Sequence, residues 1–399
     1  MSSMGKALFS VVVALISSQA VAEPKYDPGA SDTEIKIGQT SAYSGPFSAW
    51  SVSAKVHLAY MKMLNESGGV NGRKINLISL DDSYSPPKTV EHTRRLVESD
   101  QVLFLFGSLG TASNTAVHKY LNSRKIPQLF PVSGAAKWSD PEHYPWTMGW
   151  MPSFSKEGFL YGKYVLANKP DAKIAIFFQN DDYGKDFVEG FEKALGAAAP
   201  SMVVIRTSYQ SADPTVESQI VSMKASGANV LLDASSPRFA AQAIKRMGEI
   251  GWKPMHLLAS PSAVIDTVFK PAGTEYAKGI ISATYLKDPA SPDLKSDAGV
   301  EAYLSFMRKY SPDADPQNGN AVWAYASAET LVHVLRQCGD DLTRENIMRQ
   351  AANLKDIQIS MIYPGIRINT SPSDYEPLED ELLQEFDGST MRLLDARAR

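Results

Sequence analysis

The sequence of 399 residues contains one cysteine, Cys338, so no disulfide can form within the chain. Stability in an oxidising compartment must therefore come from a buried core. The chain also lacks phosphate-loop, GxGxxG, HExxH and CxxC motifs, and no GxSxG precedes a plausible catalytic triad. Its six histidines are scattered, with no pair at metal-ligand spacing. We therefore expect no enzymatic activity, no cofactor and no metal.

An excess of charge of one sign is also missing. The formal net charge is -4, with 21% charged and 44% hydrophobic residues. This near-neutral balance argues against nucleic acid or an anionic membrane surface as a partner. The length exceeds the usual size of one domain, so two domains are expected.

The first apolar run, Ala7 to Ile16, is too short to span a bilayer, which needs about 20 residues. Lys6 precedes it, and the small residues Ala20-Val21-Ala22 follow it. This order is typical of a signal peptide, here residues 1–22, and the alternative is a membrane anchor. We expect cleavage near Ala22 and export of a soluble protein.

Strand and helix patterns alternate along the rest of the chain. A strand at Ile35 runs into the Ser44-Gly45-Pro46 turn, and residues 102–106 form an apolar run typical of a strand buried on both faces. The βαβ order predicts a parallel sheet with helices on both faces. A similar unit begins beyond Pro152, so two α/β lobes would face each other across a cleft. Ligands of such sheets bind at the carboxyl ends of the strands.

The loop at residues 107–111 is the best candidate for a binding site. Ser108 and Thr111 place hydroxyls beside backbone N–H groups at a predicted helix N-terminus, and no lysine follows at the position that a phosphate loop requires. Such a loop suits a small anion, most simply a carboxylate. The pairs Asp81-Asp82 and Asp181-Asp182 are interpreted as turn and cap residues, because adjacent carboxylates at a strand end diverge.

Six segments occur in an order and spacing that is specific: IKIGQTSAYSGPFSAW, NESGGVNGRKINLISLDD, GSLGTASN, PVSGAAKWSDP, NDDYGKDF and KPAGTEYAKGI. Together they resemble the periplasmic solute-binding receptors of the leucine/isoleucine/valine-binding type, the extracellular components of ABC importers. The resemblance implies the type I periplasmic binding protein fold, with two doubly wound parallel-sheet lobes, three hinge crossovers and a ligand cleft. It implies a first lobe of residues 32–150 and 285–358 and a second of residues 151–284 and 359–399. The crossings then lie near Trp150, Tyr285 and Tyr363.

The same resemblance implies ligand contacts. In the first lobe Trp50 is the aromatic wall, Thr111 grips a carboxylate, and backbone donors follow the fourth strand. In the second lobe the exit loops contribute, and Trp150 is a further ring surface. The implied residues are Trp50, Ser108, Leu109, Thr111, Ser133, Gly134, Ala135, Ala136, Trp150, Tyr183, Ser235, Ser236 and Pro261.

Two departures from the family pattern matter. Its first-lobe disulfide falls on Tyr84 and Gly110, and its acidic partner for a ligand ammonium is missing from Ser260-Pro261-Ser262. A buried ammonium without a counter-charge costs several kcal/mol, so a free amino acid would need Asp233 or Asp266 as substitute.

We therefore expect a monomeric periplasmic receptor for an aromatic or other hydrophobic organic acid, delivering it to an ABC permease in the inner membrane. The alternative ligand is a branched-chain or other hydrophobic amino acid. A hydrolase or a sensor ectodomain is less favoured, because neither catalytic residues nor a membrane-spanning run after the lobes was found.

Overall fold

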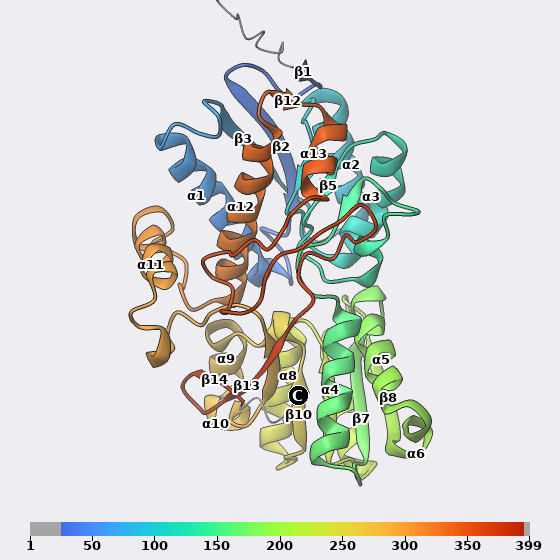
Figure 1. Cartoon of the computed structure of the whole chain (residues 1–399). Helices are drawn as coiled ribbons and strands as arrows, with labels where there is room; N and C mark the ends of the chain where they lie inside the picture. The colour runs from blue at the N-terminus through green and yellow to red at the C-terminus, as the bar shows by residue number, and fades with distance from the viewer. Residues whose placement is uncertain (1–24, 395–399) are drawn as a thin grey trace, which may run out of the picture.

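A computed structural model describes residues 25–394, so the expected signal segment lies outside the described residues. Figure 1 shows two α/β lobes, one above the other, each with helices packed around a sheet. Most strand pairs in both sheets are parallel, which confirms the predicted fold class. Within residues 25–394 no helix is long and apolar enough to cross a membrane.

The first lobe is built on a parallel sheet with the strand order β3-β2-β4-β5-β6. Its strands are β2 (Glu34–Ser41), β3 (Lys74–Asp81), β4 (Leu105–Phe106), β5 (Gln128–Leu129) and β6 (Thr147–Met148). Its helices are α1 (Val52–Glu66), α2 (Pro86–Arg94), α3 (Thr111–Ser123), α11 (Ala298–Tyr310), α12 (Gly319–Cys338) and α13 (Arg344–Ala351). A short pair, β1 (Lys25–Tyr26) with β12 (Asp341–Leu342), ties the start of the described chain to this lobe. Residues 102–106 are fully buried, as expected for a strand covered on both faces, but only Leu105 and Phe106 form a strand.

The second lobe has the strand order β14-β13-β11-β10-β9-β7-β8. Its strands are β7 (Ile174–Gln179), β8 (Val203–Tyr209), β9 (Val230–Ala234), β10 (Met255–Leu258), β11 (Ile281–Thr284), β13 (Leu382–Phe386) and β14 (Met391–Leu393). Its helices are α4 (Phe154–Asn168), α5 (Asp182–Leu195), α6 (Ala199–Met202), α7 (Glu217–Ala225), α8 (Pro237–Glu249), α9 (Lys270–Ala272) and α10 (Thr274–Ala277). Strands β13 and β14 are antiparallel additions made by the end of the described chain.

Glycines allow α4 and α5 to pack at very short range on one face of the second sheet. A Cβ atom on Gly190 would lie 1.8 Å from the Ser155 carbonyl oxygen, and one on Gly158 would lie 2.2 Å from that of Phe187. Both neighbours are backbone atoms, so they cannot swing away. The close contact fixes the direction of α4, whose first turn faces the other lobe.

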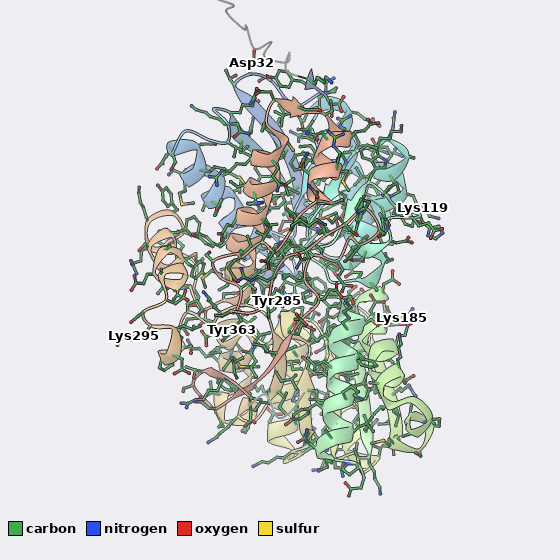
Figure 2. The ribbon with its side chains drawn as sticks, viewed as in Figure 1. Asp32, Lys119, Lys185, Tyr285, Lys295 and Tyr363 are labelled. Atoms are coloured by element: carbon green, nitrogen blue, oxygen red, sulfur yellow. The ribbon has the colours of Figure 1, made fainter. Side chains whose placement is uncertain are left out.

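The chain passes between the lobes near Trp150 and near Tyr285. At the first crossing Trp150 packs in the first-lobe core and Phe154 in the second-lobe core. At the second crossing Ala283 packs in the second-lobe core and Tyr285 in the first-lobe core. Figure 2 shows Tyr285 and Tyr363 close to the level where the lobes meet, and the Tyr363 N–H donates to the Tyr285 carbonyl at 3.0 Å.

The expected third crossing near Tyr363, and with it the assignment of residues 359–399 to the second lobe, needs correction. After Tyr363 the chain turns back, and Ile368, Tyr375 and Leu378 are buried in the first-lobe core. The Tyr375 carbonyl also accepts a hydrogen bond from Ser139. The chain therefore reaches the second lobe only between residues 378 and 382, where β13 begins. Burial of these apolar side chains holds residues 366–378 on the first lobe.

Candidate functional site

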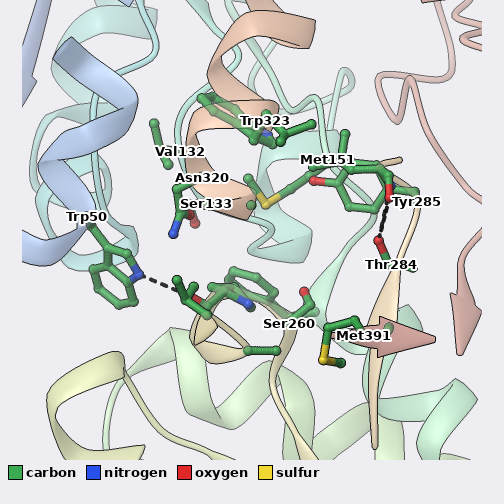
Figure 3. A pocket seen from close by; sticks show the side chains of 18 of the residues that line it. Trp50, Val132, Ser133, Met151, Ser260, Thr284, Tyr285, Asn320, Trp323 and Met391 are labelled. Carbon is green, nitrogen blue, oxygen red and sulfur yellow. Dashed lines mark hydrogen bonds between the residues drawn. The ribbon is translucent and has the colours of Figure 1, made fainter. Parts of the chain in front are cut away.

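A cavity lies between the lobes, at the carboxyl ends of strands from both sheets (Figure 3). About 130 Å³ of it can be reached by the centre of a water molecule, which is room for several waters or for a small organic molecule. The first lobe contributes Trp50, Tyr84, Leu109, Gly110, Thr111, Val132, Ser133, Gln317, Gly319, Asn320, Val322 and Trp323. The crossings and the second lobe contribute Met151, Phe154, Tyr183, Ser260, Pro261, Ala263, Val264, Ile265, Ala283, Thr284, Tyr285, Leu286, Lys287, Asp288, Pro289, Gln384 and Met391.

One end of the cavity offers a hydroxyl hydrogen at a helix N-terminus. Helix α3 begins at Thr111, after Gly110 at φ 93°, and within residues 25–394 no side chain caps its first turn. The Thr111 and Ser133 hydroxyls are 2.7 Å apart. Ser133 Oγ already accepts from Trp138 Nε1 at 2.8 Å and from the Ala135 N–H at 3.3 Å.

These contacts fix the order of the protons. A hydroxyl oxygen has two lone pairs, and both on Ser133 are taken, so Ser133 donates its hydrogen to Thr111. The hydrogen of Thr111 is then free to point into the cavity. A free O–H at the positive end of a helix is an arrangement that favours a negatively charged ligand group.

Aromatic rings form the adjacent wall. The ring centres of Trp50 and Tyr183 are 6.3 Å apart, and those of Trp50 and Tyr84 are 6.0 Å apart. Gly110 is necessary here, because a Cβ atom at this position would lie 2.3 Å from the Tyr84 ring. The two positions that carry the disulfide in the resembled family are therefore neighbours in this chain, and the tyrosine ring occupies the space between them.

Trp50 also joins the lobes directly. Its Nε1 donates to the Pro261 carbonyl oxygen at 3.2 Å, a contact drawn as a dashed line in Figure 3. The Ala136 N–H donates to Asp186 of α5 at 2.9 Å, and Lys137 forms an ion pair with Asp182. The described conformation is thus closed around the cavity.

Two charged residues line the cavity near the second crossing. Lys287 is engaged, because its Nζ lies 2.8 Å from both Asp297 carboxylate oxygens and from the Ser360 carbonyl. Asp288 accepts from the Ala290 N–H at 2.8 Å, and burial raises the pKa of its carboxyl. Within residues 25–394 no group of three or more His, Cys, Asp or Glu side chains is arranged to hold a metal ion.

Six of the residues expected at the site line this cavity: Trp50, Leu109, Thr111, Ser133, Tyr183 and Pro261. The segments after β2, β4, β5 and β10 and the first turn of α5 bring them together. The other seven do not line it. Ser108 Oγ accepts from the Thr40 N–H, Gly134 packs against the Pro152 carbonyl, and Ala135 is buried. The Ala136 N–H already has its partner in Asp186.

Trp150, Ser235 and Ser236 are corrections with a common cause, because neighbouring side chains separate them from the cavity. Trp150 is fully buried in the first-lobe core, and its Nε1 donates to Thr330 at 3.0 Å. Ser235 accepts from Tyr183 through its carbonyl, and Ser236 pairs with the Tyr209 hydroxyl. The two proposed substitutes for the missing acid do not reach the cavity either: Asp233 pairs with His256 and Asp266 with Lys270.

The far end of the cavity was missed by sequence reasoning. Figure 3 shows Met151, Tyr285 and Trp323 on the side away from Trp50, and Met391 comes from β14. Trp323 follows the helical apolar pattern of α12, so the sequence predicts an ordinary core residue at this position. Among residues 25–394 its buried Nε1 has no hydrogen-bond partner. A ligand oxygen would satisfy this donor.

Comparison with known proteins identifies the family. The family model described as periplasmic binding protein matches residues 34–377. This chain belongs to the periplasmic binding protein family. Leu/Ile/Val-binding protein homolog 7 of Brucella abortus is 23% identical over 367 residues, covering 89% of this chain and 88% of the relative. An amino acid binding protein of Pseudomonas aeruginosa is 23% identical, covering 69% of this chain and 71% of the relative. The resemblance to the leucine/isoleucine/valine-binding type is thereby confirmed.

Solved structures of the family share the fold. A branched chain amino acid ABC transporter protein from Thermus thermophilus with bound valine has a TM-score of 0.80 at 19% identity, covering 91% of this chain and 96% of that one. A fatty acid ABC transporter substrate-binding protein from Thermomonospora curvata has a TM-score of 0.79 at 18% identity, covering 94% and 96%. The family consists of solute-binding proteins, so the cavity between the lobes is the place to expect a solute.

Proposed function

We propose that this periplasmic binding protein is the receptor of an ABC importer and binds a small carboxylate with an aromatic or hydrophobic body. The observation that carries the proposal is the set of contacts at Ser133, from which we inferred that Ser133 donates its hydroxyl hydrogen to Thr111. The hydroxyl hydrogen of Thr111 is then free to point into the cavity beside the N-terminus of α3. A carboxylate is the simplest ligand group that uses both the donor and the helix dipole.

The rest of the wall supports an apolar body. Trp50, Phe154 and Tyr183 offer rings, and the loop at residues 260–262 contributes no carboxylate. A ligand ammonium at that loop would lose its hydration without gaining a counter-charge from it. A wall of aromatic rings suits an aromatic or aliphatic ligand group.

Closure is the proposed mechanism. The ligand carboxylate is held by the first lobe and capped by the second, so the ligand binds the closed form better and shifts the population toward it. The closed form is then presented to a permease in the inner membrane. In this proposal the receptor acts as a monomer in the periplasm, after cleavage of the signal segment near Ala22.

Replacing Trp50 with phenylalanine tests closure. The ring is retained but the bond to the Pro261 carbonyl is lost. A neutral hydrogen bond contributes about 0.5–1.5 kcal/mol, so we expect the affinity for a binding ligand to fall by about two- to tenfold. Calorimetry and small-angle scattering would measure the affinity and the closed fraction. Trp252→Phe is the matched control, because its Nε1 bonds Ala228 within the second lobe at 3.0 Å. An equal loss in both variants would contradict a role in closure.

A hydrophobic amino-acid receptor is the second candidate. The names of the relatives favour it, and Asp288 places a carboxylate at the cavity that a ligand ammonium could use.

Calorimetric titration with benzoate, 3-phenylpropanoate, phenylalanine and leucine separates the two candidates. We expect binding of at least one of the two organic acids and no tight binding of leucine. A thermal-shift screen would extend the panel, since a ligand at about 100 times its dissociation constant adds roughly 2.7 kcal/mol of stability. Tight leucine binding with no response to either acid would refute the carboxylate proposal.

A further inference from the structure

Glu157 is a carboxyl group placed directly behind the second-lobe wall of the cavity. It lies in the first turn of α4 and is 2% exposed. Its Oε1 accepts from the Ser260 N–H, and its Oε2 accepts from the Ser260 hydroxyl, both at 2.7 Å. Ser260 lines the cavity in the loop where an acid was expected. Because Ser260 spends its hydrogen on Glu157, only its lone pairs remain for a ligand.

The contacts of the Tyr161 hydroxyl show which form of Glu157 is present. Tyr161 Oη accepts from the Ala283 N–H at 2.8 Å. It also lies 2.6 Å from Glu157 Oε1 and 2.7 Å from the Leu258 carbonyl oxygen. One phenol hydrogen cannot serve two oxygen atoms at these distances. If Glu157 carries a proton and donates it to Tyr161, then Tyr161 donates to Leu258 and every contact is satisfied.

The surrounding charges agree with a neutral acid. Lys156, the neighbouring cation, is turned away to Glu376 at 2.9 Å and Glu379 at 2.8 Å. Glu381, on the third crossing, is a second carboxyl close enough to repel the charge of Glu157. Burial raises the pKa of Glu157 to about 7. The facing phenols of Tyr161, Tyr183 and Tyr285 remain neutral, because burial raises the pKa of each.

We infer that Glu157 is a proton-controlled charge selector of the ligand site, which acts through Ser260. The inference rests on the proposed function, because it takes the cavity as the ligand site. With Glu157 protonated, the second-lobe wall is neutral and accepts a simple carboxylate. With Glu157 ionised, the wall repels a carboxylate and attracts an ammonium group that bonds the lone pairs of Ser260. Glu157 thus supplies, from behind Ser260, the acid that the loop itself lacks.

The test compares two probes that share a body, 3-phenylpropanoate and phenylalanine, across pH 6 to 8. We expect the affinity for 3-phenylpropanoate to fall above pH 7, approaching tenfold per pH unit, and that for phenylalanine to rise. Calorimetry of the wild type in buffers of different ionisation enthalpy should show proton uptake on binding 3-phenylpropanoate at pH 7.5. Glu157→Gln should abolish the pH dependence. Asp288→Asn, which removes the carboxylate that lines the cavity, should keep the pH dependence of the affinity.

The inference would be overturned if the affinity of the wild type for 3-phenylpropanoate did not change with pH. It would also be overturned if Asp288→Asn removed the pH dependence of this affinity and Glu157→Gln kept it. Because Glu157, Tyr161 and Ser260 all belong to the second lobe, the neutral acid is also testable without ligand. The melting temperature of the wild type should fall by several degrees relative to Glu157→Gln between pH 5 and pH 8. Parallel melting profiles would overturn the inference even if no probe binds, whereas diverging profiles without binding would refute only the proposed ligand class.

Discussion

Replacing Thr111 with valine is expected to weaken binding of a carboxylate probe by about ten- to hundredfold. Valine keeps the shape of threonine but removes the hydroxyl whose hydrogen is free to enter the cavity. A hydrogen bond to a charged group contributes about 1.5–3 kcal/mol, and every 1.4 kcal/mol is a factor of ten in affinity. Calorimetric titration with 3-phenylpropanoate would measure the loss. Since Thr111 is buried at the start of α3, circular dichroism should accompany each titration.

Thr115→Val is the matched control for this substitution. Thr115 lies one turn further along α3, and its hydroxyl bonds the Thr111 carbonyl at 2.8 Å without lining the cavity. The affinity of Thr115→Val for 3-phenylpropanoate should stay within about twofold of the wild-type value. Ser133→Ala should weaken binding less than Thr111→Val, because it leaves the Thr111 hydroxyl in place without its partner. Unchanged affinity in Thr111→Val would remove the observation on which the proposed function depends.

Gly190→Ala is expected to destabilise the protein by about 2–3 kcal/mol. In an open helix the same change would stabilise by about 1 kcal/mol, because glycine is a poor helix former. Here the new Cβ atom would lie 1.8 Å from the Ser155 carbonyl oxygen of α4. The neighbour is backbone, so α4 and α5 must separate, and overpacking of this kind costs more than the gain in helix propensity. Urea unfolding of the variant and the wild type would measure the difference.

Gly319→Ala provides the control, because an added Cβ atom at this helical position meets no atom within 4 Å. It should change the free energy of unfolding by less than about 1 kcal/mol. If Gly190→Ala proved as stable as the control, the close approach of the two helices would not be a requirement of the fold.

Sequence reasoning succeeded where local rules and family order act together. The apolar run at residues 102–106 predicted a fully buried segment, of which Leu105 and Phe106 form strand β4, and the turn after Ser108 predicted the start of α3 at the cavity. The family resemblance placed Trp50 at the cleft, and Trp50 lines the cavity. The first two features depend on neighbours in sequence, and the place of Trp50 on the order of the family segments, so a single chain reveals them.

The errors have a different origin, because they depend on contacts between distant segments. Trp150 adjoins a crossing, as expected, but Thr330 of α12 holds its ring in the core. Trp323 and Met391 reach the cavity from helices and strands far along the chain. Nothing in the pattern around Glu157 distinguishes it from an exposed residue of a first helical turn. Only Tyr161 and Ser260, brought together by the fold, show what it does.

The late third crossing has a consequence for folding. Residues 366–378 complete the first-lobe core, and β13 and β14 then complete the second sheet. The first lobe is whole only when residues 366–378 have been synthesised, and the second only when β13 and β14 have, although each lobe looks like a separate domain. Pairings between segments so distant in sequence form slowly, because a long loop must close before any contact rewards it. The two lobes, which the proposed closure would move as two bodies, therefore both depend on residues 366–393 to fold.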